Sequence, residues 1–220
     1  MKFNSLKYNE IRLFFEKNNK NPNIKPTIVA ISKNKPLLLI EEAIEKGVRV
    51  FGENRVQEAI SKFSTIKEKN ASFDKNIELH LTGPLQRNKV KDALKIFDVF
   101  QTLDRENLAL EFTKHLLPNN KKRFFIQINI GDEKQKSGIP INTSNEFIKF
   151  CNHDLKINII GLMCIPPFIK DPTTYFIQLK KIAIQNNLKY LSMGMSSDYE
   201  FAIKAGATHI RIGTLLFGKR

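Results

Sequence analysis

Tryptophan, a disulfide framework and a membrane-spanning segment are all missing from this sequence of 220 residues. It holds no run of about 18 uncharged apolar residues that could cross a bilayer. Residues 1–5 lack the apolar core and the cleavage site of a secretory signal. The two cysteines, Cys151 and Cys164, match neither CxxC nor zinc-ligand spacing, and a disulfide is not expected in a reducing compartment. These absences predict a cytoplasmic protein without a membrane segment.

Common catalytic motifs are missing as well. The sequence has no Walker A loop, no GxGxxG and no GxSxG, so nucleotide-dependent chemistry and serine hydrolysis have no support. The four histidines are His80, His115, His153 and His209, and they form no HExxH pair. We expect each of them to be structural or exposed, and we expect no metal site.

The net charge of +14 would attract a nucleic-acid backbone without sequence preference. The lysines, however, are spread along the whole chain and often stand beside asparagine, as in residues 17–20 and 119–122. A coding bias toward AT-rich codons would give the same composition. No RNP1-like motif, zinc finger or long basic helix accompanies the charge. Specific nucleic-acid binding is therefore not expected, and a basic RNA-associated protein remains only an alternative.

Apolar runs alternate with helical patterns along the chain, after an amphipathic helix in the first twenty residues. The predicted strands cover residues 27–32, 48–53, 78–83, 99–103, 123–130, 159–165, 190–195 and 209–217. The helical patterns between them cover residues 37–46, 56–69, 86–96, 106–117, 143–151, 173–186 and 197–205. Eight such units predict an α/β fold, a single (β/α)8 TIM barrel over residues 1–220. An open doubly wound sheet is the alternative.

The active face of such a barrel lies where strands end and the loops to the next helices begin. Lys33 stands at the end of the first predicted strand, with Lys35 as a neighbouring cation. Desolvation and a nearby cation lower the pKa of a lysine ammonium, and a neutral amine forms a Schiff base with an aldehyde. Lys33 is therefore a candidate functional residue. The alternative is a solvated surface lysine.

Two glycine-containing segments lie at the ends of the last two predicted strands. Gly194 lies near the end of the seventh strand with Ser196 directly after it, and Gly213 and Thr214 lie within the eighth run. Loops at these places recurrently bind phosphate in this fold through backbone N–H groups. Ser196 or Ser197 as the N-cap of a helix over residues 198–205 is a compatible alternative.

Eight stretches of the chain carry a family resemblance, in the family's order and spacing. They are IVAISKNKP (28–36), VFGENRVQEA (50–59), HLTGPLQRNKV (80–90), QTLDRENLA (101–109), QINIGDEKQKSGI (127–139), IIGLMCIP (159–166), LSMGMSSDYEFAI (191–203) and GATHIRIGTLLFG (206–218). In these stretches the sequence resembles the pyridoxal phosphate homeostasis protein family. The resemblance covers nearly the whole chain.

The resemblance implies the fold of the N-terminal barrel of alanine racemase with an extra N-terminal helix, usually as a monomer. It implies pyridoxal 5′-phosphate (PLP) held covalently as a Schiff base on Lys33, with Arg211 facing the pyridine nitrogen. Ser196, Gly213 and Thr214 then correspond to residues around the phosphate, and Asn54 to a residue lining the cofactor. With Gly194 from the glycine turns, the predicted cofactor-binding residues are Lys33, Asn54, Gly194, Ser196, Arg211, Gly213 and Thr214.

Three positions depart from the family pattern. Asn34 replaces the common Thr, Arg87 stands where a small polar residue is usual, and Cys164 stands where Ala is usual. None of the three removes a predicted cofactor contact. Lys35 and Lys136 stay open as secondary attachment sites.

The resemblance implies a protein of intracellular PLP homeostasis, which buffers and delivers the cofactor without established catalysis. An arginine beside the pyridine nitrogen disfavours protonation of that nitrogen, which makes the ring a poorer electron sink. The sequence ends at Arg220, without the second domain that gives alanine racemase its opposing tyrosine. PLP-dependent apo-enzymes are the expected recipients of the cofactor. A weak PLP-dependent amino-acid racemase is the rival interpretation.

Overall fold

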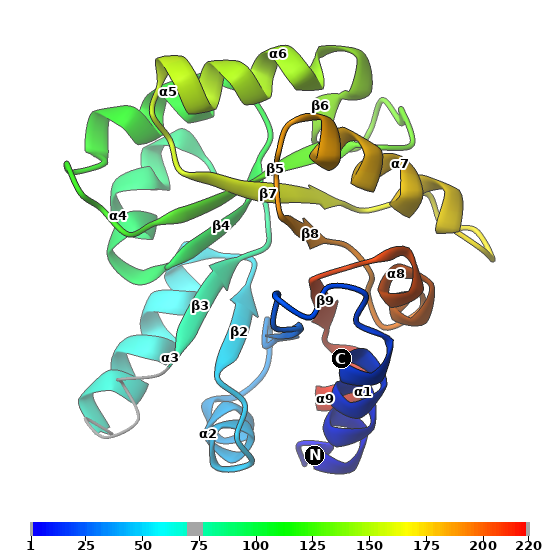
Figure 1. Ribbon diagram of the computed structural model, residues 1–220. Coiled ribbons are helices and arrows are strands. Elements are labelled where there is room, and N and C mark those ends of the chain that lie inside the picture. The colour runs from blue at the N-terminus through cyan, green and yellow to red at the C-terminus, as the bar shows by residue number, and fades with distance from the viewer. Residues whose placement is uncertain (1, 70–76, 219–220) are drawn as a thin grey trace.

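Eight parallel strands form a closed ring in the computed structural model, which describes residues 2–69 and 77–218 (Figure 1). The strands are β1 (Thr27–Ile31), β2 (Val50–Glu53), β3 (Glu78–Leu81), β4 (Val99–Leu103), β5 (Arg123–Asn129), β7 (Ile159–Cys164), β8 (Tyr190–Ser192) and β9 (His209–Ile212). Each pairs in parallel with its neighbour, and the ring closes because β9 pairs with β1 and β4 pairs with β5. The predicted barrel is confirmed, and the open sheet is wrong.

Helices cover the outside of the ring (Figure 1). The α-helices are α1 (Ser5–Asn18), α2 (Leu37–Glu45), α3 (Val56–Lys69), α4 (Val90–Ile96), α5 (Glu106–His115), α6 (Ser144–Lys149), α7 (Thr173–Gln185), α8 (Tyr199–Ala205) and α9 (Thr214–Phe217). Short 3-10 turns, η2 (Arg87–Lys89) and η3 (Ile141–Thr143), precede α4 and α6, and a π-helical turn, η4 (Phe150–Asp154), follows α6. The β/α alternation therefore follows the predicted order throughout.

Two local predictions are wrong, and one short strand is not among the predicted elements. The eighth strand was expected to run over residues 209–217, but β9 ends at Ile212 and α9 follows it as one helical turn. A two-residue strand, β6 (Ile139–Pro140), pairs with β5 and was not predicted. The N-cap residue of α8 is Asp198, so neither Ser196 nor Ser197 caps that helix.

The extra N-terminal helix is confirmed and is held against the C-terminal helix. Figure 1 shows α1 beside α9, and the Asn4 amide donates a hydrogen bond of 2.9 Å to the Leu216 carbonyl. The rings of Phe3 and Phe217 lie 5.5 Å apart, and Phe3 is buried. The first helix is therefore part of the wall that supports the last βα unit.

Apolar side chains fill two spaces. The larger cluster lies between the strands and the surrounding helices, and a smaller one, built on Val99, Phe125 and Met163, is separate from it. Strand residues alternate between the two faces of the wall, so the smaller cluster lies inside the ring. Buried polar side chains occur on other strands of the ring, including His80 on β3 and Arg211 on β9.

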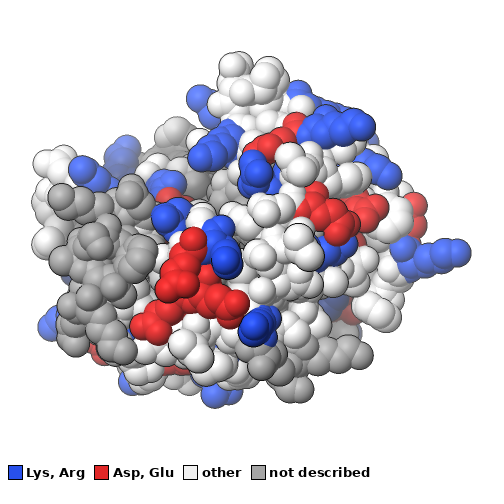
Figure 2. Space-filling view, turned by 90° about the horizontal axis from the view of Figure 1, so that it is seen from below, with Lys and Arg blue, Asp and Glu red and all other residues white. Residues whose placement is uncertain are grey.

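Charged side chains of both signs share the surface. On the face shown in Figure 2, acidic side chains lie among the basic ones and divide them into separate groups, as far as the described residues form that face. Both cysteines are free and buried. Among the described residues, no helix has the length and apolar character needed to cross a membrane.

Candidate functional site

The predicted site residues lie at the carboxyl ends of neighbouring strands. Lys33 follows β1, Asn54 follows β2, and Arg211 lies in β9, which pairs directly with β1. Gly213 and Thr214 follow β9 and begin α9, while Gly194 and Ser196 follow β8. A Cβ added to Gly213 would stand 3.3 Å from the Cβ of Ile31 on β1, so that turn lies close to the end of the strand that carries Lys33. One end of the barrel thus gathers all of these residues.

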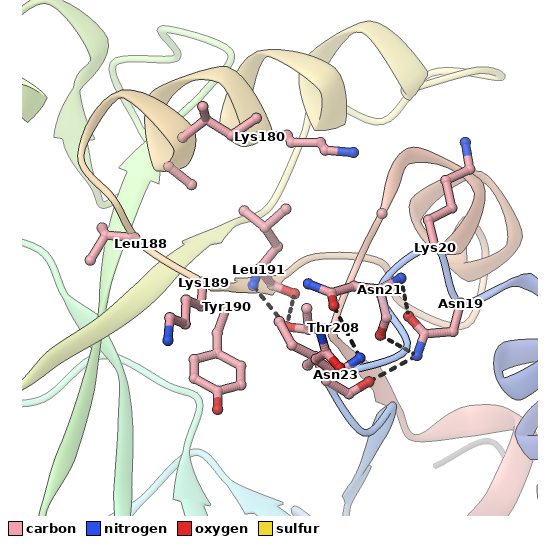
Figure 3. A pocket seen from close by; sticks show the side chains of 14 residues that line it. Asn19, Lys20, Asn21, Asn23, Lys180, Leu188, Lys189, Tyr190, Leu191 and Thr208 are labelled. Atoms are coloured by element: carbon pink, nitrogen blue, oxygen red, sulfur yellow. Dashed lines mark hydrogen bonds between the residues drawn. The ribbon is translucent and has the colours of Figure 1, made fainter.

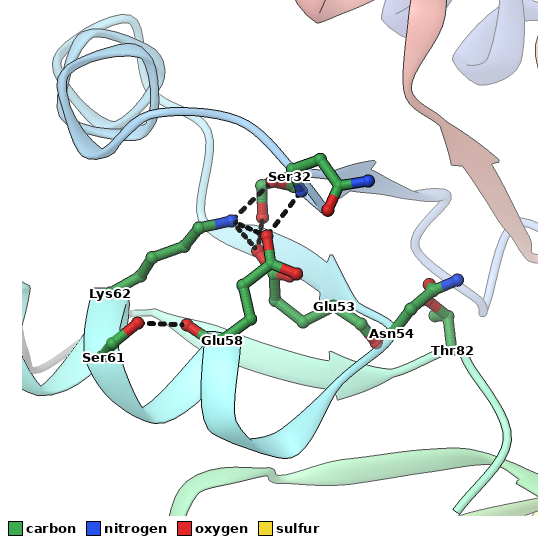
Figure 4. A network of polar contacts seen from close by, with 8 residues as sticks. Ser32, Glu53, Asn54, Glu58, Ser61, Lys62 and Thr82 are labelled. Carbon is green, nitrogen blue, oxygen red and sulfur yellow. Dashed lines mark hydrogen bonds and ion pairs between the residues drawn. The ribbon is translucent and has the colours of Figure 1, made fainter. Parts of the chain in front are cut away.

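A polar cluster, not predicted from the sequence, holds the turn that contains Lys33 (Figure 4). The Ser32 hydroxyl donates to Glu53 Oε1 over 2.6 Å, and Lys62 Nζ donates to the Ser32 carbonyl over 2.9 Å. On the other side of Lys33, the Asn34 amide donates to Glu58 Oε1 over 2.5 Å. We call Ser32, Glu53, Glu58 and Lys62 the turn clamp. Ser32 and the backbone N–H of Asn34, on either side of Lys33, are hydrogen-bonded to residues of β2 and α3. The backbone of Lys33 is therefore fixed relative to these two elements.

Lys62 ties the carboxylates of the turn clamp together. Its Nζ lies 3.1 Å from Glu53 Oε1 and 2.5 Å from Glu58 Oε1. Glu53 is fully buried, and its Oε2 has no hydrogen-bond partner within the described part of the chain. Burial raises the pKa of Glu53, while the hydrogen bond from Ser32 and the charge of Lys62 oppose that rise. For Glu58 the burial effect is outweighed by the hydrogen bonds from Lys62 and Asn34, and its pKa is lowered.

The conformation of the turn suits the residue found there. Asn34 has a φ of +57°, in the left-handed region. Asparagine tolerates this region far better than a β-branched residue does. The departure from the family's usual Thr at this position therefore agrees with the local backbone.

Arg211 is buried and firmly held. Its Nη1 donates to Ser192 Oγ and its Nη2 to the Cys164 carbonyl, each over 2.9 Å. These contacts use two of the five N–H donors of a guanidinium. Burial raises the pKa of the Cys164 thiol to about 12, so this side chain stays a neutral neighbour of Arg211. The Cys164 departure consequently adds no charge at this place.

The turns after β8 and β9 are closely packed. A Cβ on Gly194 would lie 2.5 Å from the Cβ of Ala202 in α8, which leaves room only for glycine. The Gly194 carbonyl accepts the Arg211 amide over 2.9 Å, and the Met195 amide donates to Asp198 Oδ1 over 2.6 Å. Ser196 is half-buried and Thr214 is exposed. These turns are thus fixed to β9 and α8.

Asn54 borders a cavity of about 950 Å³ at the same end of the barrel. The cavity is lined by Asn54, Arg55, Val56, Gln57, Glu58, Pro84, Leu85, Gln86, Lys89, Asp104, Arg105 and Ser137. Asn54 Oδ1 accepts a hydrogen bond of 3.0 Å from Thr82 Oγ1. Arg87 is exposed on the neighbouring turn η2. A second cavity, about 540 Å³, lies against residues 19–24 and Tyr190 and contains none of the predicted residues (Figure 3).

The two other lysines considered for attachment have partners of their own. Lys35 is buried, and its Nζ donates to the Gly218 carbonyl over 2.9 Å. Lys136 Nζ donates to the Pro166 carbonyl over 3.0 Å and pairs with Glu133. Both ammonium groups are therefore anchored to backbone carbonyls.

Comparison with known proteins gives a consistent result. The family described as alanine racemase, N-terminal domain, matches residues 19–220. The chain is 37% identical over 203 residues to the pyridoxal phosphate homeostasis protein of Aquifex aeolicus, covering 88% of this chain and 86% of that one. The protein of that name from Escherichia coli strain K12 is 37% identical over 206 residues, with the same two coverages.

Solved structures agree with the fold. PipY of Synechococcus elongatus without PLP superposes with a TM-score of 0.83 at 29% identity, covering 97% of this chain and 99% of that one. The structure of PipY with PLP bound gives 0.80. Alanine racemase from Corynebacterium glutamicum, at 12% identity, gives 0.68 and covers 98% of this chain and 61% of that one, which supports the fold alone.

Proposed function

Because the chain belongs to the alanine racemase N-terminal domain family, and within it to the pyridoxal phosphate homeostasis proteins, we propose that it binds PLP at the carboxyl end of its barrel and keeps the cofactor available to other proteins. One observation carries the assignment of the site. Lys33, on a turn held from both sides, follows β1, and the buried Arg211 lies in the adjacent strand β9. The pair combines an amine for covalent attachment with a fixed cation.

The residues present fit the chemistry of the cofactor. When bound, PLP supplies an aldehyde for attachment to an amine and a ring whose electron-withdrawing power depends on protonation of its nitrogen. Lys33 provides the amine through Nζ. Arg211 retains three of its five N–H donors for a ligand, and its charge keeps a neighbouring ring nitrogen unprotonated. The turns with Gly194, Ser196, Gly213 and Thr214 supply amide and hydroxyl donors for a phosphate group.

We further propose that this site holds PLP without catalysing a reaction on it. An unprotonated ring beside Arg211 is a poor electron sink, and the thiol of Cys164 is too basic to act as a deprotonated base near neutral pH. Asn54 lines the site on its β2 side. Delivery to a PLP-dependent apo-enzyme would require the loaded protein to give up PLP without a substrate.

Borohydride reduction of the PLP-loaded protein, followed by peptide mass mapping, tests the attachment site. The phosphopyridoxyl mass is expected on the peptide that contains Lys33 and is expected to vanish in Lys33→Ala. Lys136→Ala is the matched control and should keep the label on Lys33. A label on any other lysine of the wild-type protein would overturn the assignment.

Exchange of the Cα proton tests the absence of catalysis. The loaded protein is incubated with amino acids in deuterium oxide, and deuterium at Cα is measured by mass spectrometry. We expect no incorporation above that of free PLP. Incorporation that is lost in Lys33→Ala would establish the racemase alternative instead.

A further inference from the structure

A chain of hydrogen bonds, buried from Arg211 to His80 and part-buried at Glu78, continues from Arg211 into the interior of the barrel. Ser192 Oγ, which accepts from Arg211 Nη1, lies 2.6 Å from Gln101 Oε1. Gln101 Nε2 lies 2.7 Å from His80 Nδ1, and His80 Nε2 lies 2.5 Å from Glu78 Oε1. Glu78 also pairs with Arg123. Four strands, β3, β4, β8 and β9, contribute the side chains from Glu78 to Arg211.

The donor and acceptor roles of these groups show that all hydrogen bonds of the chain run in one direction, from Arg211 to Glu78. The amide nitrogen of Gln101 can only donate, so His80 Nδ1 accepts and carries no proton. The ring proton of neutral His80 is then on Nε2 and is donated to Glu78. The amide oxygen of Gln101 can only accept, so the Ser192 hydroxyl donates to it and receives a hydrogen bond from Arg211. Every donor from Arg211 to Glu78 therefore points the same way.

The charges at the two ends agree with this direction. Burial lowers the pKa of His80, even though the hydrogen bond and charge of Glu78 oppose that effect, so the ring between the two ends is neutral near neutral pH. For Glu78 the burial effect, which raises its pKa, is outweighed by the hydrogen bonds from His80 and Arg123, so the carboxylate is charged. A row of aligned donors between a cation and an anion strengthens each of its members.

We propose that His80, Gln101 and Ser192 are positioning residues that fix the Arg211 guanidinium where it meets the cofactor, through a chain anchored on Glu78. The inference rests on the proposed function, because the contact of Arg211 with the ring of PLP belongs to that proposal. Ser192 and the Cys164 carbonyl take one N–H from each terminal nitrogen of Arg211, which fixes the plane of the group. Gln101 and His80 in turn fix the rotation of the Ser192 hydroxyl.

Gln101→Leu cuts the chain two bonds away from Arg211 without touching that residue. We expect the equilibrium dissociation constant for PLP, measured by absorbance titration, to rise about tenfold, which corresponds to about 1.4 kcal/mol. Gln127→Leu is the matched control: Gln127 is buried in β5, and among the described residues its side chain donates to the Ser137 carbonyl, which is not part of the hydrogen-bond chain below Arg211. The control should change the PLP affinity less than twofold. Gln101→Glu keeps an acceptor for Ser192 but loses the amide donor to His80, so it should restore only part of the affinity.

A double-mutant cycle separates positioning from a merely structural role. In an Arg211→Met background, Gln101→Leu is expected to have no further effect on PLP affinity. If the two changes add, the proposal is wrong. If Gln101→Leu does not fold, Ser192→Ala, which removes a single hydroxyl, replaces it in the double-mutant cycle. We then expect Ser192→Ala to weaken PLP binding in the wild-type background and to have no further effect in the Arg211→Met background.

A measurement on the ligand-free protein makes failure of this inference distinguishable from failure of the proposed function. Nitrogen-detected NMR of the Arg211 side chain should give separate, slowly exchanging Nη signals in the wild-type protein and averaged signals in Gln101→Leu. Averaged signals in the wild type would refute positioning, even if PLP labels Lys33. Separate signals that survive in Gln101→Leu would refute it as well. A label away from Lys33 would refute the proposed function while leaving the NMR result intact.

Discussion

Asn34 stands one residue after Lys33 and shows how a single side chain is matched to a backbone conformation. Its φ of +57° places Cβ close to the following carbonyl, a contact that β-branched residues avoid. We predict that Asn34→Thr lowers the free energy of unfolding by about 1 to 2 kcal/mol. Asn34→Gly keeps the backbone N–H that donates to Glu58, so it should change the free energy of unfolding by only a few tenths of a kcal/mol. Urea unfolding of the wild type and of the two variants measures both changes. Equal stability of the wild type and Asn34→Thr would contradict the prediction and would mean that the turn adopts another backbone conformation.

Lys62 neutralises the buried carboxylate beside that turn, and its loss would leave Glu53 without a cation. Breaking a buried pair from one side costs about 3 to 5 kcal/mol. We therefore predict a loss of about that size in Lys62→Met, and a recovery of more than half in the double variant with Glu53→Gln. Lys95→Met removes an exposed ion pair with Asp92 and should not change stability measurably. The measurement is equilibrium unfolding in urea. No recovery in the double variant would mean that Lys62 acts through packing alone.

At the scale of elements, α1 stabilises the end of the chain that begins at the turn of Gly213 and Thr214. Phe3 is buried against Phe217 of α9, whereas Leu6, three residues later, is 83% exposed. We predict that Phe3→Ala lowers the free energy of unfolding by about 3 kcal/mol, because it leaves a cavity where the residue before the N-cap of α1 packs against α9. Since α9 starts at Thr214, PLP affinity should fall as well. Leu6→Ala is the control for both measurements and should leave them unchanged.

The same elements show what the sequence could predict. The alternation of apolar runs and helical patterns predicts the barrel, the end of the first predicted strand indicates Lys33, and the family resemblance indicates Arg211. The sequence predicts a single strand over residues 209–217, since periodicity does not separate a short buried strand from a buried helical turn. The two-residue strand β6 is too short to carry a pattern.

The residues of the turn clamp and of the hydrogen-bond chain below Arg211 could not be predicted from the sequence, for a different reason. The turn clamp joins Ser32 to Glu53 across 21 residues, and the chain below Arg211 joins Gln101 to Ser192 across 91. Such pairs are defined only once the ring has closed and register has set which side chains face inward. A local sequence pattern can therefore indicate a residue that contacts a ligand. It does not show which distant residues position that side chain.

At the scale of the whole molecule, the barrel encloses two neutral imidazoles. The rings of His80 and His209 lie 5.9 Å apart, and His209 also contacts the rings of Phe125 and Tyr190. Burial lowers the pKa of His209 to about 3, and the proximity of His80 adds to this because two imidazolium ions side by side would repel each other. The charged groups that act on His209 are Glu78, Arg123 and Arg211. In the unfolded chain His209 is protonated below about pH 6.5, whereas in the folded barrel it stays neutral down to about pH 3.

This difference makes the barrel sensitive to acid in a predictable direction. Between about pH 6.5 and pH 3 the unfolded state binds the proton of His209 and the folded state does not, so the free energy of unfolding falls as the pH falls, by about 1.4 kcal/mol per pH unit from this histidine. In His209→Phe, whose ring can pack against Phe125 and Tyr190, this contribution is removed. We predict that urea unfolding at pH 7, 6, 5 and 4, at constant ionic strength, gives a slope smaller by about 1 kcal/mol per pH unit in this variant. His153→Phe alters an exposed histidine and should leave the slope unchanged. An unchanged slope in His209→Phe would mean that the folded barrel admits the proton, and the neutral interior on which the direction of the Arg211 chain depends would have to be reconsidered.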